Sequence, residues 1–226
     1  RMPFVLMHTS IRVRPALGLG FALLILLAQN SSAASQTAAP GKLSVLVLPF
    51  ENQTGEVQWE HWGDTLQRLL EFQLGAVKAM RVLPSRARGR STLNLKAGAA
   101  PGLAEVRKAG ESVEARRVIW GSFQRTNGQW RATARVMNVA RGEASQEFRA
   151  AAADWFDLRD KLGAQLLKKL GVKAVGAERV KMANRFTASA VGMEWYSKAY
   201  FVQAHHRPLP EQEAAIREAL AADPQS

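Results

Sequence analysis

The chain has 226 residues, no cysteine and a formal net charge of +12. The absence of cysteine excludes disulfide bonds, thiolate metal sites and a lipid attached through a cysteine side chain. The length is enough for one domain with its own hydrophobic core and one further element.

The first 34 residues have the pattern of a secretory signal peptide. Arg12 and Arg14 precede an apolar run over 15–28, and small residues follow it. A basic flank, a short apolar core and a small-residue site are typical of such a leader, and the run is shorter than the ~20 residues of a spanning helix. We expect cleavage after Ala33 or Ala34 and a linker over 35–41. The alternative is an uncleaved anchor.

Residues 42–173 have the pattern of one α/β domain. A β-branched run over 43–50 predicts a buried strand. An apolar stripe at helical spacing predicts a helix over 59–77, in which Trp59 and Trp62 are core residues. A second strand over 80–84, an exposed basic loop over 85–100 and a weaker helix over 101–115 follow.

The second half of this domain contains a hairpin signal. Asn127-Gly128 separates strand-like segments over 118–125 and 129–139, and this dipeptide favours a tight turn because both residues tolerate positive φ. A third strand is expected over 143–149 and a helix over 154–170, with Gly171 after its end. The order β-α-β-α-β-β-β-α predicts an α/β (α+β) fold with a mixed sheet and helices packed on it.

Residues 44–55 read SVLVLPFENQTG, residues 118–123 read VIWGSF and residues 141–143 read RGE. In this order they resemble motifs of the TolB amino-terminal-like domains, which include the flagellar outer-membrane protein FlgO. Residues 44–55 resemble the family's opening "AVLPFxNxSGD", and residues 62–66 stand where the family has "ADGLTEEL". Residues 118–123 resemble "YVLEGSV", and residues 141–143 match "TGE". The resemblance covers 42–173 and implies a compact domain without catalysis or a cofactor, used for protein interactions in the cell envelope.

Residues 174–226 are expected to form a helical hairpin that resembles a tetratricopeptide (TPR) repeat. Residues 195–200 fit the first helix of such a repeat, and residues 219–224 fit its closing "ALxxDP". The alternative is an ordinary helical hairpin. One repeat cannot bury its own apolar face, so we expect it to belong to a longer array that continues after Ser226. Tyr196, Tyr200 and Gln203 are candidate partner-binding residues on the first helix.

No recognisable catalytic motif is present, since the sequence lacks both GxSxG and GxxxxGK[ST]. His61 is expected to be a surface or half-buried residue. His205 and His206 lie at the end of a predicted helix, where a positive charge interacts favourably with the helix dipole, and they are not expected to bind metal. No cofactor and no metal are therefore expected. A hydrolase is the weakest alternative, and it requires Glu51 and Asp64 together with His61 in one deep pocket.

Arg86, Arg88 and Arg90 form a basic patch in the loop over 85–100. Such a patch can contact nucleic acid, anionic lipid or peptidoglycan, but the loop lacks the aromatic residues of a nucleic-acid surface. A solvated loop is the simplest interpretation, and an envelope contact is the second.

Together these features predict an exported, non-enzymatic interaction scaffold in the periplasm of a bacterial envelope. Its partners would be other envelope proteins and not nucleic acid, with membrane contact only through an uncleaved leader. The alternative is an extracytoplasmic sensory or regulatory segment of a membrane-anchored signalling protein with TPR repeats.

Overall fold

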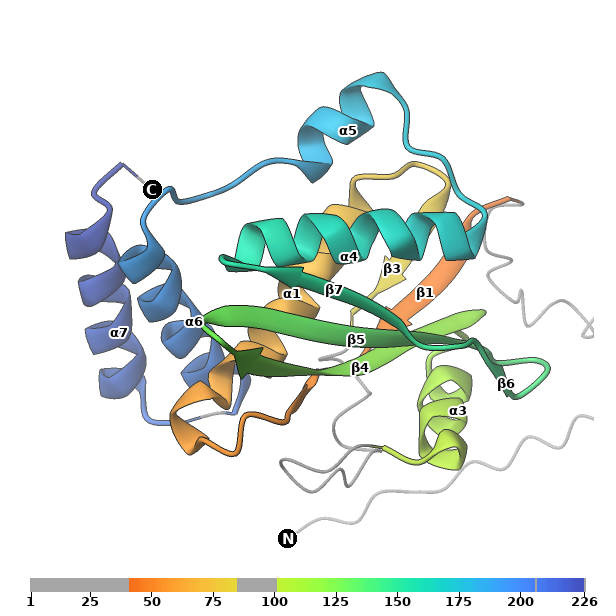
Figure 1. Cartoon of the computed structure of the whole chain (residues 1–226), viewed down its shortest axis with the longest axis horizontal. Helices are drawn as coiled ribbons and strands as arrows, with labels where there is room; N and C mark the ends of the chain where they lie inside the picture. The colour runs from red at the N-terminus through yellow and green to blue at the C-terminus, as the bar shows by residue number, and fades with distance from the viewer. Residues whose placement is uncertain (1–40, 85–100, 206, 226) are drawn as a thin grey trace, which may run out of the picture. The chain divides into compact units, whose positions relative to one another are not determined.

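The computed structural model describes residues 41–84, 101–205 and 207–225. They belong to the compact unit Ala39–Ser226 and form a mixed sheet with six α-helices (Figure 1). The strands are β1 (Leu43–Val47), β2 (Glu51–Asn52), β3 (Met80–Leu83), β4 (Arg117–Thr126), β5 (Gln129–Asn138), β6 (Glu143–Ala144) and β7 (Phe148–Ala152). The helices are the 3₁₀ helix η1 (Val57–Trp59) and the α-helices α1 (His61–Gly75), α3 (Leu103–Ser112), α4 (Trp155–Leu170), α5 (Gly176–Met182), α6 (Ala190–Ala204) and α7 (Leu209–Ala222).

The strand order in the sheet is β3-β1-β4-β5-β6, with β2 paired to β4 and β7 paired to β5. β1 is parallel to both β3 and β4, whereas β4 and β5 form an antiparallel hairpin. Asn127 and Gly128 in its turn have φ of 51° and 75°, as a type I′ turn requires. The expected mixed α/β architecture is therefore confirmed.

The sheet has an apolar core on each face. α1 and α4 cover one face, and their leucines pack with alternate residues of β1, β4, β5 and β7. α3 covers part of the other face with a smaller cluster around Trp120 and Met137. Because β1 is buried on both faces, Val45, Leu46 and Val47 are all fully buried, which explains the continuous apolar run in the sequence.

The opening segment differs from the expected strand over 43–50. β1 ends at Val47, and the chain resumes pairing in β2, parallel to β4. Pro49 lies in the gap, where its missing N–H cannot join a ladder. The predicted helix over 59–77 is likewise divided, since Trp59 ends η1 and the α-helix begins only at His61.

The predicted strand over 143–149 is two strands separated by a bulge. Met137 pairs with Ala144, and Ala134 pairs with Phe148. The segment from Ala144 to Phe148 is therefore one residue longer than the segment of β5 that it faces, from Ala134 to Met137. Ser145 fills the gap, because its N–H donates to the Val136 carbonyl at 2.8 Å and its Oγ accepts from the Val136 N–H at 3.0 Å.

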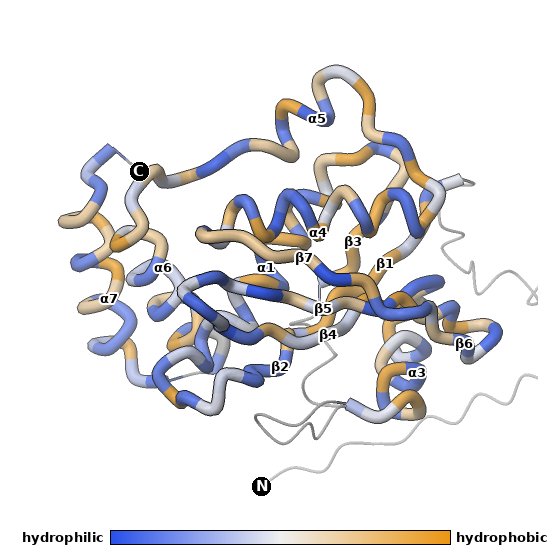
Figure 2. Tube along the Cα trace, viewed as in Figure 1, coloured by the Kyte–Doolittle hydropathy of each residue, from blue (hydrophilic) through white to orange (hydrophobic). Residues whose placement is uncertain are grey.

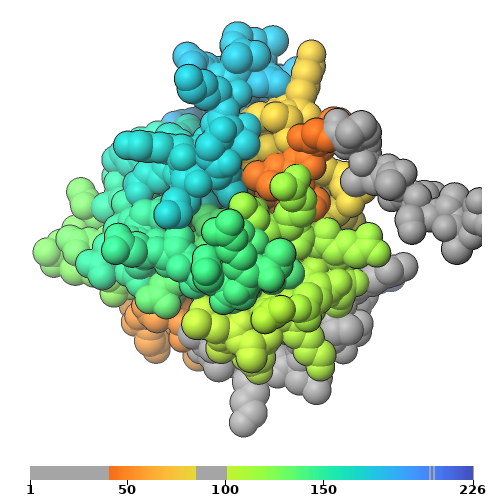
Figure 3. All heavy atoms as spheres, turned by 90° about the vertical axis from the view of Figure 1, so that its right-hand side faces the viewer, coloured from red at the N-terminus to blue at the C-terminus, as the bar shows by residue number. Residues whose placement is uncertain are grey.

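Helix α5 is a feature that the sequence patterns did not predict. The Glu178 carboxylate accepts hydrogen bonds from the backbone N–H groups of Lys78 and Val175 at 2.9 and 3.0 Å. These bonds hold the pKa of Glu178 below its usual range and fix α5 beside the end of α1. In Figure 3, α5 lies next to the β1 and β3 segments on this side of the unit.

The C-terminal region contains the expected pair of helices, α6 and α7, on either side of Pro208. Phe186 lies outside α6, which begins only after the Ser189 cap. Whether the pair is of the TPR type stays a prediction. In the described part of the chain, no helix is long and apolar enough to cross a membrane. The leader, the linker up to Pro40 and the basic loop over 85–100 lie outside the described residues.

Candidate interaction site

The helix pair α6 and α7 is attached to the sheet domain through α1. Thr65 on α1 and Ser197 on α6 share a buried hydrogen bond of 2.6 Å between their hydroxyl oxygens. Asp64, buried in the first turn of α1, pairs with His205 near the end of α6 at 3.0 Å. Buried polar contacts of this kind fix one arrangement because separation would leave the groups unsatisfied. The inner face of α6 is therefore held on α1.

One side of α7 is apolar and exposed. Leu209, Ile216 and Leu220 are 77%, 43% and 51% exposed, and their spacing of seven and four places them on one side of the helix. Figure 2 shows hydrophobic and hydrophilic segments alternating along α7. Ala215, by contrast, is buried, so α7 uses only one side for packing. We call Leu209, Ile216 and Leu220 the α7 face.

A small cavity of about 130 Å³ lies beside the α7 face. Ile216 and Leu220 form one wall, and Tyr196 and Gly192 of α6 form another. Phe186 closes it from the preceding loop, with its ring centroid 4.5 Å from that of Tyr196. The cavity has the size and lining to receive one apolar side chain.

The net charge of α7 is opposite in sign to that of the whole chain. The helix carries Glu211, Glu213 and Glu218 against the single cation Arg217, whereas the whole chain has a formal charge of +12. Arg217 forms an ion pair with Glu213 at 2.9 Å. At 100° per residue, only Glu213 lies beside the α7 face, whereas Glu211 and Glu218 lie on the opposite side of the helix.

The residues predicted from the sequence to bind a partner have different positions. Tyr196 is half-buried and lines the small cavity. Tyr200 is buried, with only 9% of its surface exposed, whereas Gln203 is exposed. Arg86, Arg88 and Arg90 lie outside the described residues. Only Tyr196 among the described candidates therefore contributes to this surface cavity.

The three residues of the hydrolase alternative line none of the cavities of about 130, 390 and 550 Å³ in the described part of the chain. Asp64 pairs with His205, whereas Glu51 accepts a hydrogen bond from Gln53 at 3.0 Å. His61 is buried, with 6% of its surface exposed, which corrects the expectation of a surface or half-buried residue. Its burial, together with the nearby Lys198, lowers its pKa to about 4. Nowhere in 41–84, 101–205 or 207–225 do three His, Asp or Glu side chains gather as metal ligands.

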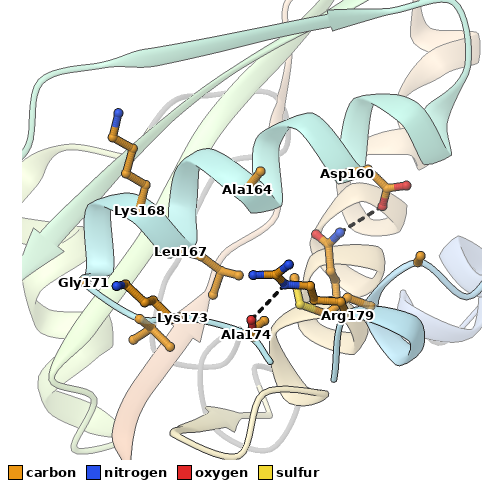
Figure 4. Close-up of a pocket in the computed structure, with 12 residues that line it drawn as sticks. Asp160, Ala164, Leu167, Lys168, Gly171, Lys173, Ala174 and Arg179 are labelled. Atoms are coloured by element: carbon orange, nitrogen blue, oxygen red, sulfur yellow. Dashed lines mark hydrogen bonds between the residues drawn. The ribbon is translucent and has the colours of Figure 1, made fainter. Parts of the chain in front are cut away.

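A larger cavity of about 550 Å³ lies between α4 and α5 (Figure 4). Two of its polar side chains form hydrogen bonds: the Gln73 amide N–H donates to Asp160 at 2.9 Å, and Arg179 donates to the Ala174 carbonyl at 3.0 Å. The Gln73 carbonyl oxygen packs against Gly163, where a Cβ atom would be only 1.8 Å away.

A third cavity, of about 390 Å³, is lined by four tryptophans. Trp62 of α1 and Trp155 of α4 stack with their ring centroids 4.2 Å apart. Trp130 of β5 lies 4.5 Å from Trp155, and Trp59 of η1 meets Trp130 edge-on at 5.3 Å. The sequence predicted Trp59 and Trp62 as core residues, and both pack in this core. It did not indicate that they would join tryptophans from the second half of the chain.

No family model and no curated protein matches the sequence. Solved structures to which it is similar include the LpoB C-terminal domain from Salmonella enterica, with 16% identity, a TM-score of 0.39, and coverage of 52% of this chain and 87% of that chain. A PelC dodecamer from Paraburkholderia phytofirmans has 16% identity and a TM-score of 0.40, with 60% and 93% coverage. TolB from Acinetobacter baumannii has 14% identity and a TM-score of 0.39, with 59% and 29% coverage. At these scores, the function must be argued from the residues of this chain.

Proposed function

We propose that this chain is an exported, non-enzymatic interaction module of the bacterial cell envelope, and that the α7 face with its cavity is the partner-binding surface. The observation that carries the proposal is that α7 exposes Leu209, Ile216 and Leu220 on one side while α6 is held on α1 by Thr65 and Asp64. A rigid support with an exposed apolar helix is the arrangement that helix-binding proteins use.

The chemistry of this surface defines the partner. An apolar side chain would enter the cavity between Tyr196 and Leu220. We therefore propose the apolar side of an amphipathic helix from another envelope protein as the occupant, with the 42–173 domain as its TolB-like scaffold and α6–α7 as a TPR-type pair.

Site-specific photocrosslinking in the native host tests this proposal. A photoreactive residue is placed at Leu220 on α7 or at Leu103 on α3, because both leucines are 51% exposed. We expect one covalent adduct of defined mass from position 220 and none of that mass from position 103. Mass spectrometry then identifies the partner and its crosslinked segment. The same adducts from both positions, or none from position 220, would contradict the proposal.

A further inference from the structure

The segment around α5 carries exposed apolar and cationic side chains next to one another. Val175 and Val180 are 63% and 74% exposed. The cationic side chains of Lys173, Arg179 and Lys181 are exposed as well. α5 projects at the surface of the unit in Figures 1 and 3. We call Lys173, Val175, Arg179, Val180 and Lys181 the α5 surface.

The inner side of α5 holds this surface in one orientation. The Glu178 carboxylate accepts its two backbone hydrogen bonds on that side, and Met182 packs in the core with the leucines of α1 and α4. At about 100° per residue, Val180 lies about 200° around the helix from Glu178 and therefore points away from the domain. Arg179 and Lys181 flank Val180, one on each side. The exposure of Val180 is thus a consequence of how α5 is anchored.

The carboxylates near the α5 surface are paired within the domain. Glu178 is only 8% exposed, and its oxygens are bonded to backbone N–H groups. Asp160 accepts hydrogen bonds from Nε and Nη2 of Arg159 at 2.8 and 2.6 Å. Within 41–84, 101–205 and 207–225, no ion pair involves the three cations of the α5 surface. This surface therefore presents three positive charges to a partner outside the described chain.

The cavity between α4 and α5 lies next to these cations. Lys173 and Arg179 line it together with Lys168 (Figure 4). Its volume of about 550 Å³ leaves room for a polar head group beside them. Ammonium and guanidinium groups are the side-chain groups that bind phosphate in proteins. The cavity therefore favours a partner that carries phosphate groups.

We propose that the α5 surface binds an anionic phospholipid bilayer. Val175 and Val180 lie at the boundary between head groups and acyl chains, and the three cations contact the phosphates. Exposed apolar side chains flanked by lysine and arginine are typical of proteins that lie on membranes. The long cationic side chains can keep their charges among the head groups while their stems stay in the apolar layer. This contact depends neither on the leader nor on the α7 face, so each can fail without the others.

The test uses the full chain with one introduced cysteine, which can be labelled specifically because the chain has no other. Val180→Cys and Val57→Cys are labelled with nitrobenzoxadiazole, whose emission shifts to the blue when it leaves water. Val57 of η1 is the matched control, since it is also an exposed valine, at 82%. Vesicles contain phosphatidylglycerol and phosphatidylcholine in equal parts, or phosphatidylcholine alone. We expect a blue shift at position 180 with the anionic vesicles only, and none at position 57 with either.

Removal of charge tests the role of the cations. In the labelled Val180→Cys protein, Lys173→Gln together with Lys181→Gln should raise the lipid concentration at half-maximal response by at least about ten-fold. Each cation near an anionic surface contributes about five-fold. Lys108→Gln together with Arg131→Gln removes the same charge from exposed positions on α3 and β5. This control should change the response by less than about two-fold, because distant charges are screened by salt.

Several outcomes would overturn the proposal. Equal shifts at positions 180 and 57 would show that the chain reaches the vesicles through another segment, such as the leader. No shift at position 180 is the result expected if this surface binds an acidic protein instead of lipid. The same response to both kinds of vesicle, or equal effects of the two double variants, would contradict recognition of lipid charge by the α5 surface.

Discussion

Gly63→Ala is expected to lower the free energy of unfolding by about 3 kcal/mol. A Cβ atom at this position in the first turn of α1 would lie 2.1 Å from the backbone oxygen of Phe50. The two residues are also joined by a hydrogen bond from the Phe50 N–H to the Gly63 carbonyl at 3.2 Å. Because the clash is with backbone, relief requires a shift of the segment between β1 and β2 away from the helix. Chemical denaturation measured by circular dichroism checks the value.

Gly75→Ala in the same helix is the matched control. No atom lies within 4 Å of a Cβ atom added at Gly75, so this substitution should be neutral or stabilise by about 0.5–1 kcal/mol. Equal unfolding midpoints for the two variants would show that the Phe50 backbone does not pack closely against Gly63 in the first turn of α1.

The second large effect is a loss of stability in acid caused by His61. Burial lowers the pKa of His61 to about 4, against an unfolded value near 6.5. The unfolded state therefore binds the proton first, and the folded state loses stability as the pH falls from about 6.5 to 4. Complete titration of a group shifted this far corresponds to about 3 kcal/mol. Of the nearby charges on α6, Lys198 lowers this pKa further and Glu194 opposes it.

His61→Phe isolates this contribution, because phenylalanine keeps an aromatic ring beside Trp62 and does not titrate. The ring centroids of His61 and Trp62 are 5.3 Å apart. The free energy of unfolding is measured for both proteins between pH 6.5 and 4 (about the two pKa values of His61). As the pH falls over this interval, the parent should lose about 3 kcal/mol more stability than the variant. Parallel pH profiles for the two proteins would show that His61 is accessible to protons in the folded state.

Much of the fold could be predicted because its signals are local. Asn127-Gly128 defines a hairpin through backbone conformation alone, and Trp130 alternates with Arg131 in burial as a strand on one apolar face requires. Asp154 and Gly171 cap the two ends of α4 as their residue types favour.

The missed features depend on contacts between distant parts of the chain. α5 is fixed by Glu178, whose partner Lys78 is 100 positions away. The bulge at Ser145 depends on hydrogen bonds to another strand. The burial of His61 and the pairing of Asp64 with His205 arise only once α6 packs on α1. For the same reason, the tryptophan cavity could not be assembled from spacing within one element.

The most direct test of the proposed function compares Leu220→Lys with Leu103→Lys. The two leucines are equally exposed, at 51%, so both variants should fold as the parent does. The partner identified by crosslinking is titrated calorimetrically against each purified full-length variant. We expect Leu220→Lys to weaken binding by at least about ten-fold, because it removes an apolar contact at the cavity and places a charge where an apolar side chain would bind. Leu103→Lys should bind as the parent does. Unchanged affinity of Leu220→Lys, or an equal loss in both variants, would contradict the assignment of the α7 face as the interaction surface.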